Sequence, residues 1–171
     1  MKKTILVYGL ISGGISAALM LGSALYMRDR PANFDGAEIF GYASIILSTL
    51  FIFLGVRAYR EQREGQQFSF GKAFQVGLYI TLISCAIYVL TWMILSGTIM
   101  SDFMDKYAAY SLQKMQESGA TMEEITQKTA EMDRYKELYK NPLTKAAVTF
   151  LEPFPIGLLV TLISAAILRR R

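Results

Sequence analysis

AFQVGLYITLISCAIYVLTWMIL, residues Ala73 to Leu95, is a run of 23 residues without a charged side chain. It follows the short entry segment Phe68-Ser69-Phe70-Gly71-Lys72. A helix of this length measures roughly 35 Å at 1.5 Å per residue, which is enough to cross a hydrocarbon layer of about 30 Å with some tilt. The run therefore predicts a transmembrane helix, and the rest of the chain has to be arranged around a membrane.

Three further apolar blocks accompany this run. They are Thr4 to Met27, Ala37 to Val56 with Glu38 at its mouth, and roughly Ala146 to Leu168. With 53% hydrophobic and 19% charged residues, the 171-residue chain has the composition of a membrane protein. We predict an all-α membrane protein of one domain, residues 1–171, with four transmembrane helices over residues 4–27, 37–56, 73–95 and 146–168.

The first block has an alternative interpretation as a secretory signal, since Gly22-Ser23-Ala24 is an acceptable cleavage site. Its apolar run is longer than the usual signal core of about 7 to 15 residues, which favours a retained helix.

Basic residues predict the orientation of the spans. Only Arg28 and Arg30 lie in the first short loop, and cytoplasmic loops of membrane proteins carry the excess of Lys and Arg. The bases are distributed among tails and loops and do not form one face, so we do not predict nucleic acid as a partner. The predicted partner is the lipid bilayer. The seven bases of the long third loop are left out of the count, because long loops cross the membrane largely regardless of charge. We predict that both termini are cytoplasmic, on the side of nine bases in the tails and the second loop: Lys2, Lys3, Arg57, Arg60, Arg63, Lys72, Arg169, Arg170 and Arg171.

Residues 101–140, between the third and fourth spans, have the composition of a soluble helical segment. Ser118-Gly119 can end one helix, and Thr121-Met122-Glu123-Glu124 has the spacing of a capping box that begins another. Asn141-Pro142 then stops the second helix. We therefore predict an extracytoplasmic helical hairpin between spans three and four.

Small residues recur every four positions in three of the spans. Gly9 and Gly13 form such a pair in the first span, Gly77 follows Ala73 in the third, and Gly157 lies in the fourth. Small faces let helix backbones approach closely, and this contact is a main source of helix association in lipid. These faces can serve packing within the chain or form the seam of a homodimer.

The fourth span contains Glu152-Pro153-Phe154-Pro155, the one local irregularity among the spans. Proline donates no backbone hydrogen bond, so the helix has to break or kink here. In one interpretation Pro153 is the first residue of a helix and Glu152 lies beside its N-terminal dipole at the interface. In the other, Glu152, Pro153 and Pro155 form an intramembrane polar site, because a carboxylate inside a membrane is a functional hypothesis by default.

Several chemistries lack their usual residues. The sequence has no histidine, so the commonest general base and transition-metal ligand is missing. The single Cys85 cannot form an intramolecular disulfide, and we interpret it as a packing residue. The sequence also shows no phosphate-binding glycine loop and no paired intramembrane carboxylates. We therefore predict no catalytic residue, no metal, no cofactor and no enzyme activity.

Six short motifs occur along the chain in a fixed order and spacing. They are Tyr8-Gly9-Leu10-Ile11-Ser12-Gly13, Phe68-Ser69-Phe70-Gly71-Lys72-Ala73-Phe74, the stretch Tyr88 to Trp92, Asp102-Phe103, Met122-Glu123-Glu124-Ile125, and the C-terminal stretch Gly157 to Arg170. Together they resemble the DUF4199 family of small bacterial membrane proteins of unknown function, found mostly in Bacteroidetes. The resemblance covers nearly the whole length and implies four spans and a bacterial inner-membrane location; it assigns no catalytic role to any residue.

Two functions are consistent with these features. The first is a non-enzymatic integral inner-membrane protein that packs with itself, as a homo-oligomer, or with an unidentified membrane partner. The alternative is a small transporter or a lipid-handling subunit, such as a flippase accessory, that uses Glu152 and the proline-broken fourth helix.

Overall fold

The computed structural model describes residues 1–28, 34–62 and 67–169. Those residues form seven helices and no strand, so the predicted all-α class is confirmed. Four stretches are long and apolar enough to cross a membrane, and α6 and α7 together make the last of them. The helices are α1 (Lys2–Arg28), α2 (Phe34–Glu61), α3 (Phe70–Gly97), α4 (Phe103–Glu117), α5 (Met122–Lys140), α6 (Pro142–Leu151) and α7 (Pro153–Leu168).

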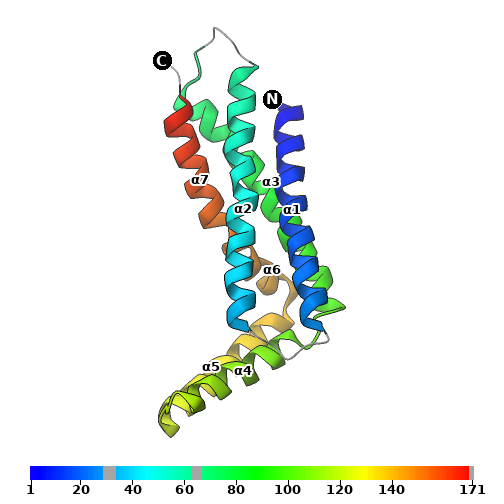
Figure 1. Cartoon of the computed structure of the whole chain (residues 1–171), viewed down its shortest axis with the longest axis vertical. Coiled ribbons are helices and arrows are strands. Elements are labelled where there is room, and N and C mark those ends of the chain that lie inside the picture. Colours follow the sequence, from blue (N-terminus) through cyan, green and yellow to red (C-terminus); the bar gives the residue numbers. More distant parts are fainter. Residues whose placement is uncertain (29–33, 63–66, 170–171) are drawn as a thin grey trace.

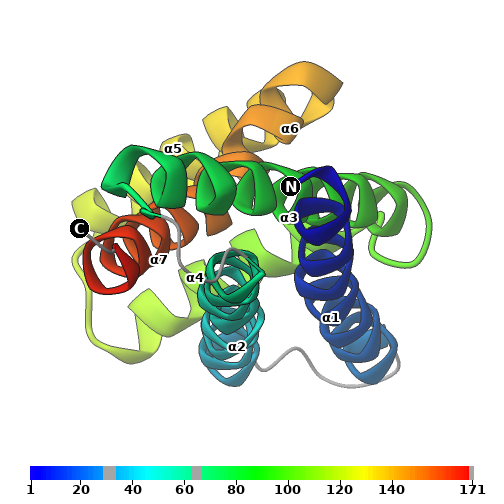
Figure 2. The ribbon, with the colours of Figure 1, turned by 90° about the horizontal axis from the view of Figure 1, so that it is seen from above.

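The long helices run side by side, and the two ends of the bundle differ (Figure 1). The start of α1 and the end of α7 lie at one end, which we call the terminal end. Helices α4 and α5 form a hairpin across the opposite end, which we call the hairpin end. Viewed along the bundle, α3 lies against α1 and α7, while α2 packs on α1 and α7 from the other side (Figure 2).

Local sequence signals explain where the described helices begin and end. The Ser69 side chain accepts a hydrogen bond from the Lys72 amide and begins α3. Thr121 and Glu124 form the predicted capping box of α5, and Gly119, with φ 77°, makes the left-handed turn between α4 and α5. Pro31 and Asn33 predict a polar turn between the first two spans, and Gly65 predicts the end of the charged extension of the second, but these residues lie outside the described ranges.

The start of the fourth span differs from the sequence-based boundary. Asn141 ends α5, as predicted, but its side chain also accepts a hydrogen bond from the Leu143 amide at 2.9 Å and so begins α6. Pro142 is the first residue of α6, a position where its missing N–H costs nothing. The apolar helix therefore starts at Pro142 and not near Ala146.

The core of the bundle lies toward the terminal end. Ile52, Val56 and Ile80 are fully buried there, together with other apolar side chains of α2, α3 and α7. Polar contacts also join the helices nearer the middle: for example, the Ser12 hydroxyl donates to the Ser48 carbonyl at 2.8 Å, and the Thr81 and Thr161 hydroxyls bond at 3.0 Å. The terminal half of the bundle is thus closed by close packing.

The four glycines singled out in the sequence lie where α3 meets α1 and α7. A Cβ at Gly13 would fall 2.5 Å from Ile87 Cδ1, and a Cβ at Gly77 would fall 2.8 Å from Thr161 Cγ2. These positions accept only a hydrogen atom unless the neighbour moves. Gly9 lies in the same way against Ile83, and Gly157 against Thr81.

Candidate functional site

The fourth span breaks at Glu152. Helix α6 ends at Leu151 and α7 begins at Pro153, and the Glu152 amide donates to the Thr149 carbonyl at 3.4 Å. Pro153 and Pro155 cannot donate the backbone bonds that would continue α6. The Glu152 side chain makes no capping bond to α7, so its carboxylate is available for other contacts.

This break directs the two halves of the span to different neighbours. Helix α7 packs on α2 and α3, whereas α6 packs on α3 and α5 and diverges from α2 toward the hairpin end (Figures 1 and 2). The hairpin-end half of α2 therefore lacks the helix that covers its other half.

A cavity of about 300 Å³ occupies the space that results. It lies among α1, α2 and α3, at the level of the α6–α7 break, beneath the hairpin. Among the described residues that line it there is no lysine or arginine, and two of them, Glu38 and Glu152, are carboxylates. Its aromatic lining residues are Phe34, Phe40, Tyr42, Tyr88, Trp92, Phe103, Tyr107 and Tyr139; Met20, Met27, Met100, Ser16, Ser23 and Ser44 are among the others.

Glu152 is held in this cavity by one strong contact. The Tyr88 hydroxyl donates a hydrogen bond of 2.8 Å to the Glu152 carboxylate. Tyr88 lies nine residues before the end of α3 at Gly97, so this bond is about 13 Å along the helix from the hairpin end. Glu152 thus lies within the apolar span, and within the described residues it has no ion-pair partner.

Tyr139 approaches the same carboxylate from the hairpin. Burial, and then the negative charge of Glu152, raise the pKa of the Tyr139 phenol, because both disfavour a phenolate. The buried Thr149 hydroxyl, one turn before Glu152, lies beside this phenol and acts in the opposite direction, lowering its pKa. The Lys145 ammonium lies 5.8 Å from the centroid of the Tyr139 ring but is not among the described lining residues of the cavity. The wall of the cavity near the break is therefore polar.

The hairpin closes the cavity at the hairpin end of the bundle. The buried Phe34 ring at the start of α2 contacts Phe103 and Tyr107 of α4, with ring centroids 5.7 and 5.4 Å apart. Beside these rings Lys114 pairs with Asp35 at 2.6 Å. Asp35, and less strongly Glu38, raise the pKa of Lys114. The ring contacts and the ion pair fix α4 across the end of α2.

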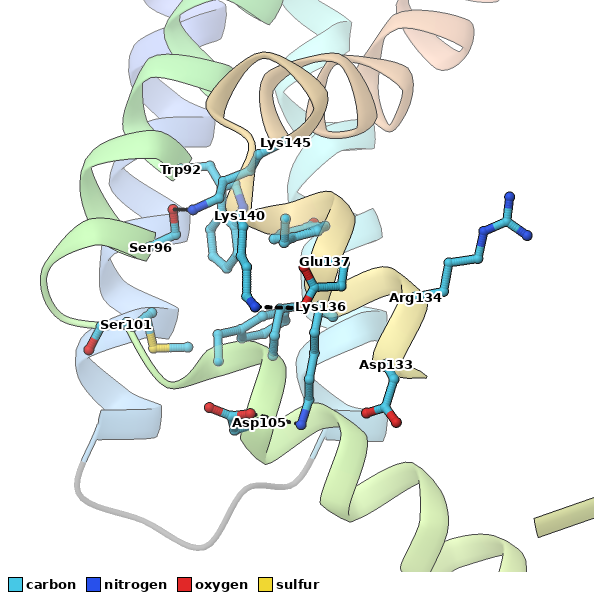
Figure 3. A pocket seen from close by; sticks show the side chains of 14 residues that line it. Trp92, Ser96, Ser101, Asp105, Asp133, Arg134, Lys136, Glu137, Lys140 and Lys145 are labelled. Atoms are coloured by element: carbon cyan, nitrogen blue, oxygen red, sulfur yellow. Dashed lines mark hydrogen bonds and ion pairs between the residues drawn. The ribbon is translucent and has the colours of Figure 1, made fainter. Parts of the chain in front are cut away.

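A second, more polar groove of about 890 Å³ adjoins the cavity between α3, α4, α5 and α6 (Figure 3). Its charges are largely paired: Lys136 contacts Asp105 at 2.8 Å, and Lys140 contacts Glu137. The Lys145 ammonium instead donates to the Ser96 hydroxyl at 3.3 Å. The first pair joins α5 to α4 within the hairpin, the second lies within α5, and the Lys145 bond joins α6 to α3. The groove shares Trp92, Met100, Phe103 and Tyr139 with the cavity.

The cavity does not continue to the terminal end. On the side of the terminal end it is followed by a void of about 10 Å³, lined in part by Ser48, Thr81, Ser84 and Gly157. Such a void holds at most about one water molecule, and the apolar core follows it. The arrangement is a pocket that opens at the hairpin half of the bundle.

Sequence reasoning singled out part of this site. It selected Glu152, Pro153 and Pro155, and the structure places Glu152 in the cavity, Pro153 buried at the start of α7, and Pro155 exposed. It missed Tyr88, whose position in an apolar run gave no sign of a carboxylate partner. Within the described ranges no three His, Cys, Asp or Glu side chains lie together in a way that would hold a metal ion.

The fold and site define an all-helical protein whose four apolar stretches indicate a membrane-spanning chain with a pocket at one end. The chain belongs to the DUF4199 family, described as "Protein of unknown function (DUF4199)", which it matches over residues 7–170. Comparison with curated proteins and with solved structures gives no match.

Proposed function

We propose that this protein is a non-enzymatic protein of the bacterial inner membrane that holds part of an amphiphile in the cavity beneath the hairpin. This is the lipid-handling function, as a carrier or as an accessory of one. The observation that supports it best is the opening of the cavity at membrane depth, beside the broken fourth span.

Two lining residues locate that opening. Tyr42 keeps half of its surface exposed and lies eight residues from the start of α2, about 12 Å along the helix. Glu152 is also exposed, and its bond to Tyr88 lies at a similar depth. Because this level is below the end of the apolar helices, the molecules that reach the opening are lipids or other amphiphiles.

The orientation belongs to the same proposal. Nine bases against two favour cytoplasmic termini. The start of α1 and the end of α7 share one end of the bundle, as that orientation requires (Figure 1). In this orientation the hairpin is extracytoplasmic and the cavity opens to the outer leaflet of the inner membrane.

The interaction-subunit hypothesis was motivated by the small-residue faces. Those faces lie against other helices of the same chain, at Gly13 on Ile87 and at Gly77 on Thr161, so a homo-oligomer or partner complex would have to use other surfaces. If the following experiment shows no amphiphile binding, it would favour a function in which the protein only forms a complex with itself or with a partner.

The single tryptophan supplies the readout, because Trp92 lines the cavity. Purified protein in detergent is titrated with an amphiphile that carries a brominated alkyl chain, and quenching of Trp92 fluorescence is measured. Gly41→Phe should fill the cavity: Gly41 lines it, and a Cβ there meets no atom within 4 Å. Gly22→Phe is the matched control, since Gly22 is equally unobstructed but exposed on α1 outside the cavity.

We expect saturable quenching in the unmodified protein and in Gly22→Phe, and its loss in Gly41→Phe. Equal quenching in both variants would mean that the amphiphile reaches Trp92 from the general lipid surface and that the cavity does not bind it.

A further inference from the structure

We infer that the cavity selects an organic ammonium group, the amine or quaternary amine head of its amphiphile. The inference rests on the proposed function and adds the chemical class of the ligand. It is carried by three features of the cavity: its charge, its aromatic walls and its size.

Among the described residues, the lining of the cavity is negatively charged. It includes the carboxylates Glu38 and Glu152 and no described lysine or arginine, although the Lys145 ammonium lies 5.8 Å from the centroid of the Tyr139 ring. Glu38 lies near Lys114, which is itself paired to Asp35. Glu152 has only the neutral Tyr88 hydroxyl as a described partner. A carboxylate at membrane depth is costly unless a cation accompanies it, so a ligand cation would complete the Glu152 site.

The aromatic walls favour an organic cation over a metal ion. Rings from α2, α3, α4 and α5 meet around the cavity, including Tyr42, Tyr88, Trp92 and Tyr139. Aromatic faces attract ammonium groups through the ring quadrupole, and the attraction strengthens when water is excluded. Quaternary ammonium ligands are typically recognised by such aromatic cages with a nearby carboxylate. The described residues provide no cluster of ligands for a metal ion.

The size fits a head group with the first part of its chain. About 300 Å³ corresponds to the volume of about ten water molecules. This accommodates a trimethylammonium or ethanolammonium group, and the exposed opening at Phe40 and Tyr42 leaves a way out for an alkyl chain. An anionic head would meet two carboxylates and no base, so the same cavity should reject it.

The experiment compares three brominated amphiphiles that share one alkyl chain and differ in the head: trimethylammonium, glucoside and sulfate. Quenching of Trp92 is measured in the full-length protein in neutral detergent. We expect the ammonium probe to saturate at the lowest concentration and the sulfate probe at the highest. Glu152→Gln should raise the half-saturating concentration of the ammonium probe by about tenfold, because it removes a charge-assisted contact. Its effect on the glucoside probe should be much smaller, because a neutral head group forms no ion pair with the carboxylate.

Two controls separate this effect from misfolding and from general surface charge. Retained saturable glucoside binding by Glu152→Gln reports an intact cavity, since the glutamine amide oxygen can still accept the Tyr88 bond. Glu117→Gln removes an exposed carboxylate of α4 that does not line the cavity, and it should not alter ammonium binding.

Competition identifies the source of the ammonium group. The probe is competed with phosphatidylethanolamine in nanodiscs and, separately, with tetramethylammonium chloride. Displacement by the lipid alone would support a lipid head group as the ligand. Displacement by both would support a free organic cation at the same site.

The outcomes keep the two proposals apart. Equal affinity for the three heads, abolished by Gly41→Phe, would overturn the ammonium inference and leave amphiphile binding intact. Quenching that is insensitive to Gly41→Phe would overturn both. An ammonium preference that survives Glu152→Gln unchanged would also overturn the inference, because the selectivity would not arise from this carboxylate.

Discussion

Gly13→Ala tests the contact between α1 and α3 with a single methyl group. The new Cβ would lie 2.5 Å from Ile87 Cδ1 and 2.8 Å from Ile87 Cβ. The Cδ1 atom can rotate away, but Ile87 Cβ is fixed to the α3 backbone, so the two helices have to separate. The neighbouring Gly14 offers a matched control on the same helix, because a Cβ there meets nothing within 4 Å.

Both variants gain helix propensity, but only Gly13→Ala overpacks the contact between α1 and α3. Alanine is better than glycine in a helix interior by roughly 0.5–1 kcal/mol, and both variants receive this gain. Overpacking costs about 1–3 kcal/mol, and only Gly13→Ala bears that cost. We therefore expect Gly13→Ala to be less stable than Gly14→Ala by about 1–3 kcal/mol.

Unfolding in mixed micelles with increasing sodium dodecyl sulfate, followed by circular dichroism, measures that difference between the two variants. Membrane insertion is checked separately, and it should be equal for both. Equal unfolding free energies for the two variants would refute the close approach of α1 and α3 at this level.

Two further predictions concern the hairpin. Reporter fusions in the turn between α4 and α5 and at the C-terminus should report opposite sides of the membrane, whereas signals from the same side would contradict the four-span topology. Hydrogen bonds from Thr121 hold the pKa of the Glu124 carboxyl below its ordinary value of 4.5. These bonds therefore stabilise the start of α5 at pH values above 4.5. The stabilisation is lost as the pH falls through the lowered pKa of the folded protein. The Thr121 amide should accordingly lose protection from hydrogen exchange on acidification in the unmodified protein, and a Glu124→Gln variant with the same pH dependence would contradict this assignment.

Sequence alone determined the properties that depend on neighbouring residues. An uncharged run such as Ala73 to Leu95 is long enough to span a membrane whatever surrounds it, so the four spans followed from composition and length. The capping box at Thr121 and the break before Pro153 are equally local, because a cap needs a side chain three residues away and proline lacks its own N–H. These signals predicted the helices to within a few residues.

Tertiary structure decided which of these features meet. The four-residue spacing singled out Gly13 and not Gly14, but it did not identify the helix that packs there; only the structure places Ile87 of α3 against Gly13 and leaves the space at Gly14 open. Likewise Tyr88 and Glu152 are 64 residues apart, and their bond exists because α6 diverges from α2 while α7 stays in the bundle. Helix formation is governed by local bonds, whereas the cavity arises from the relative directions of several helices, which no single stretch of sequence specifies.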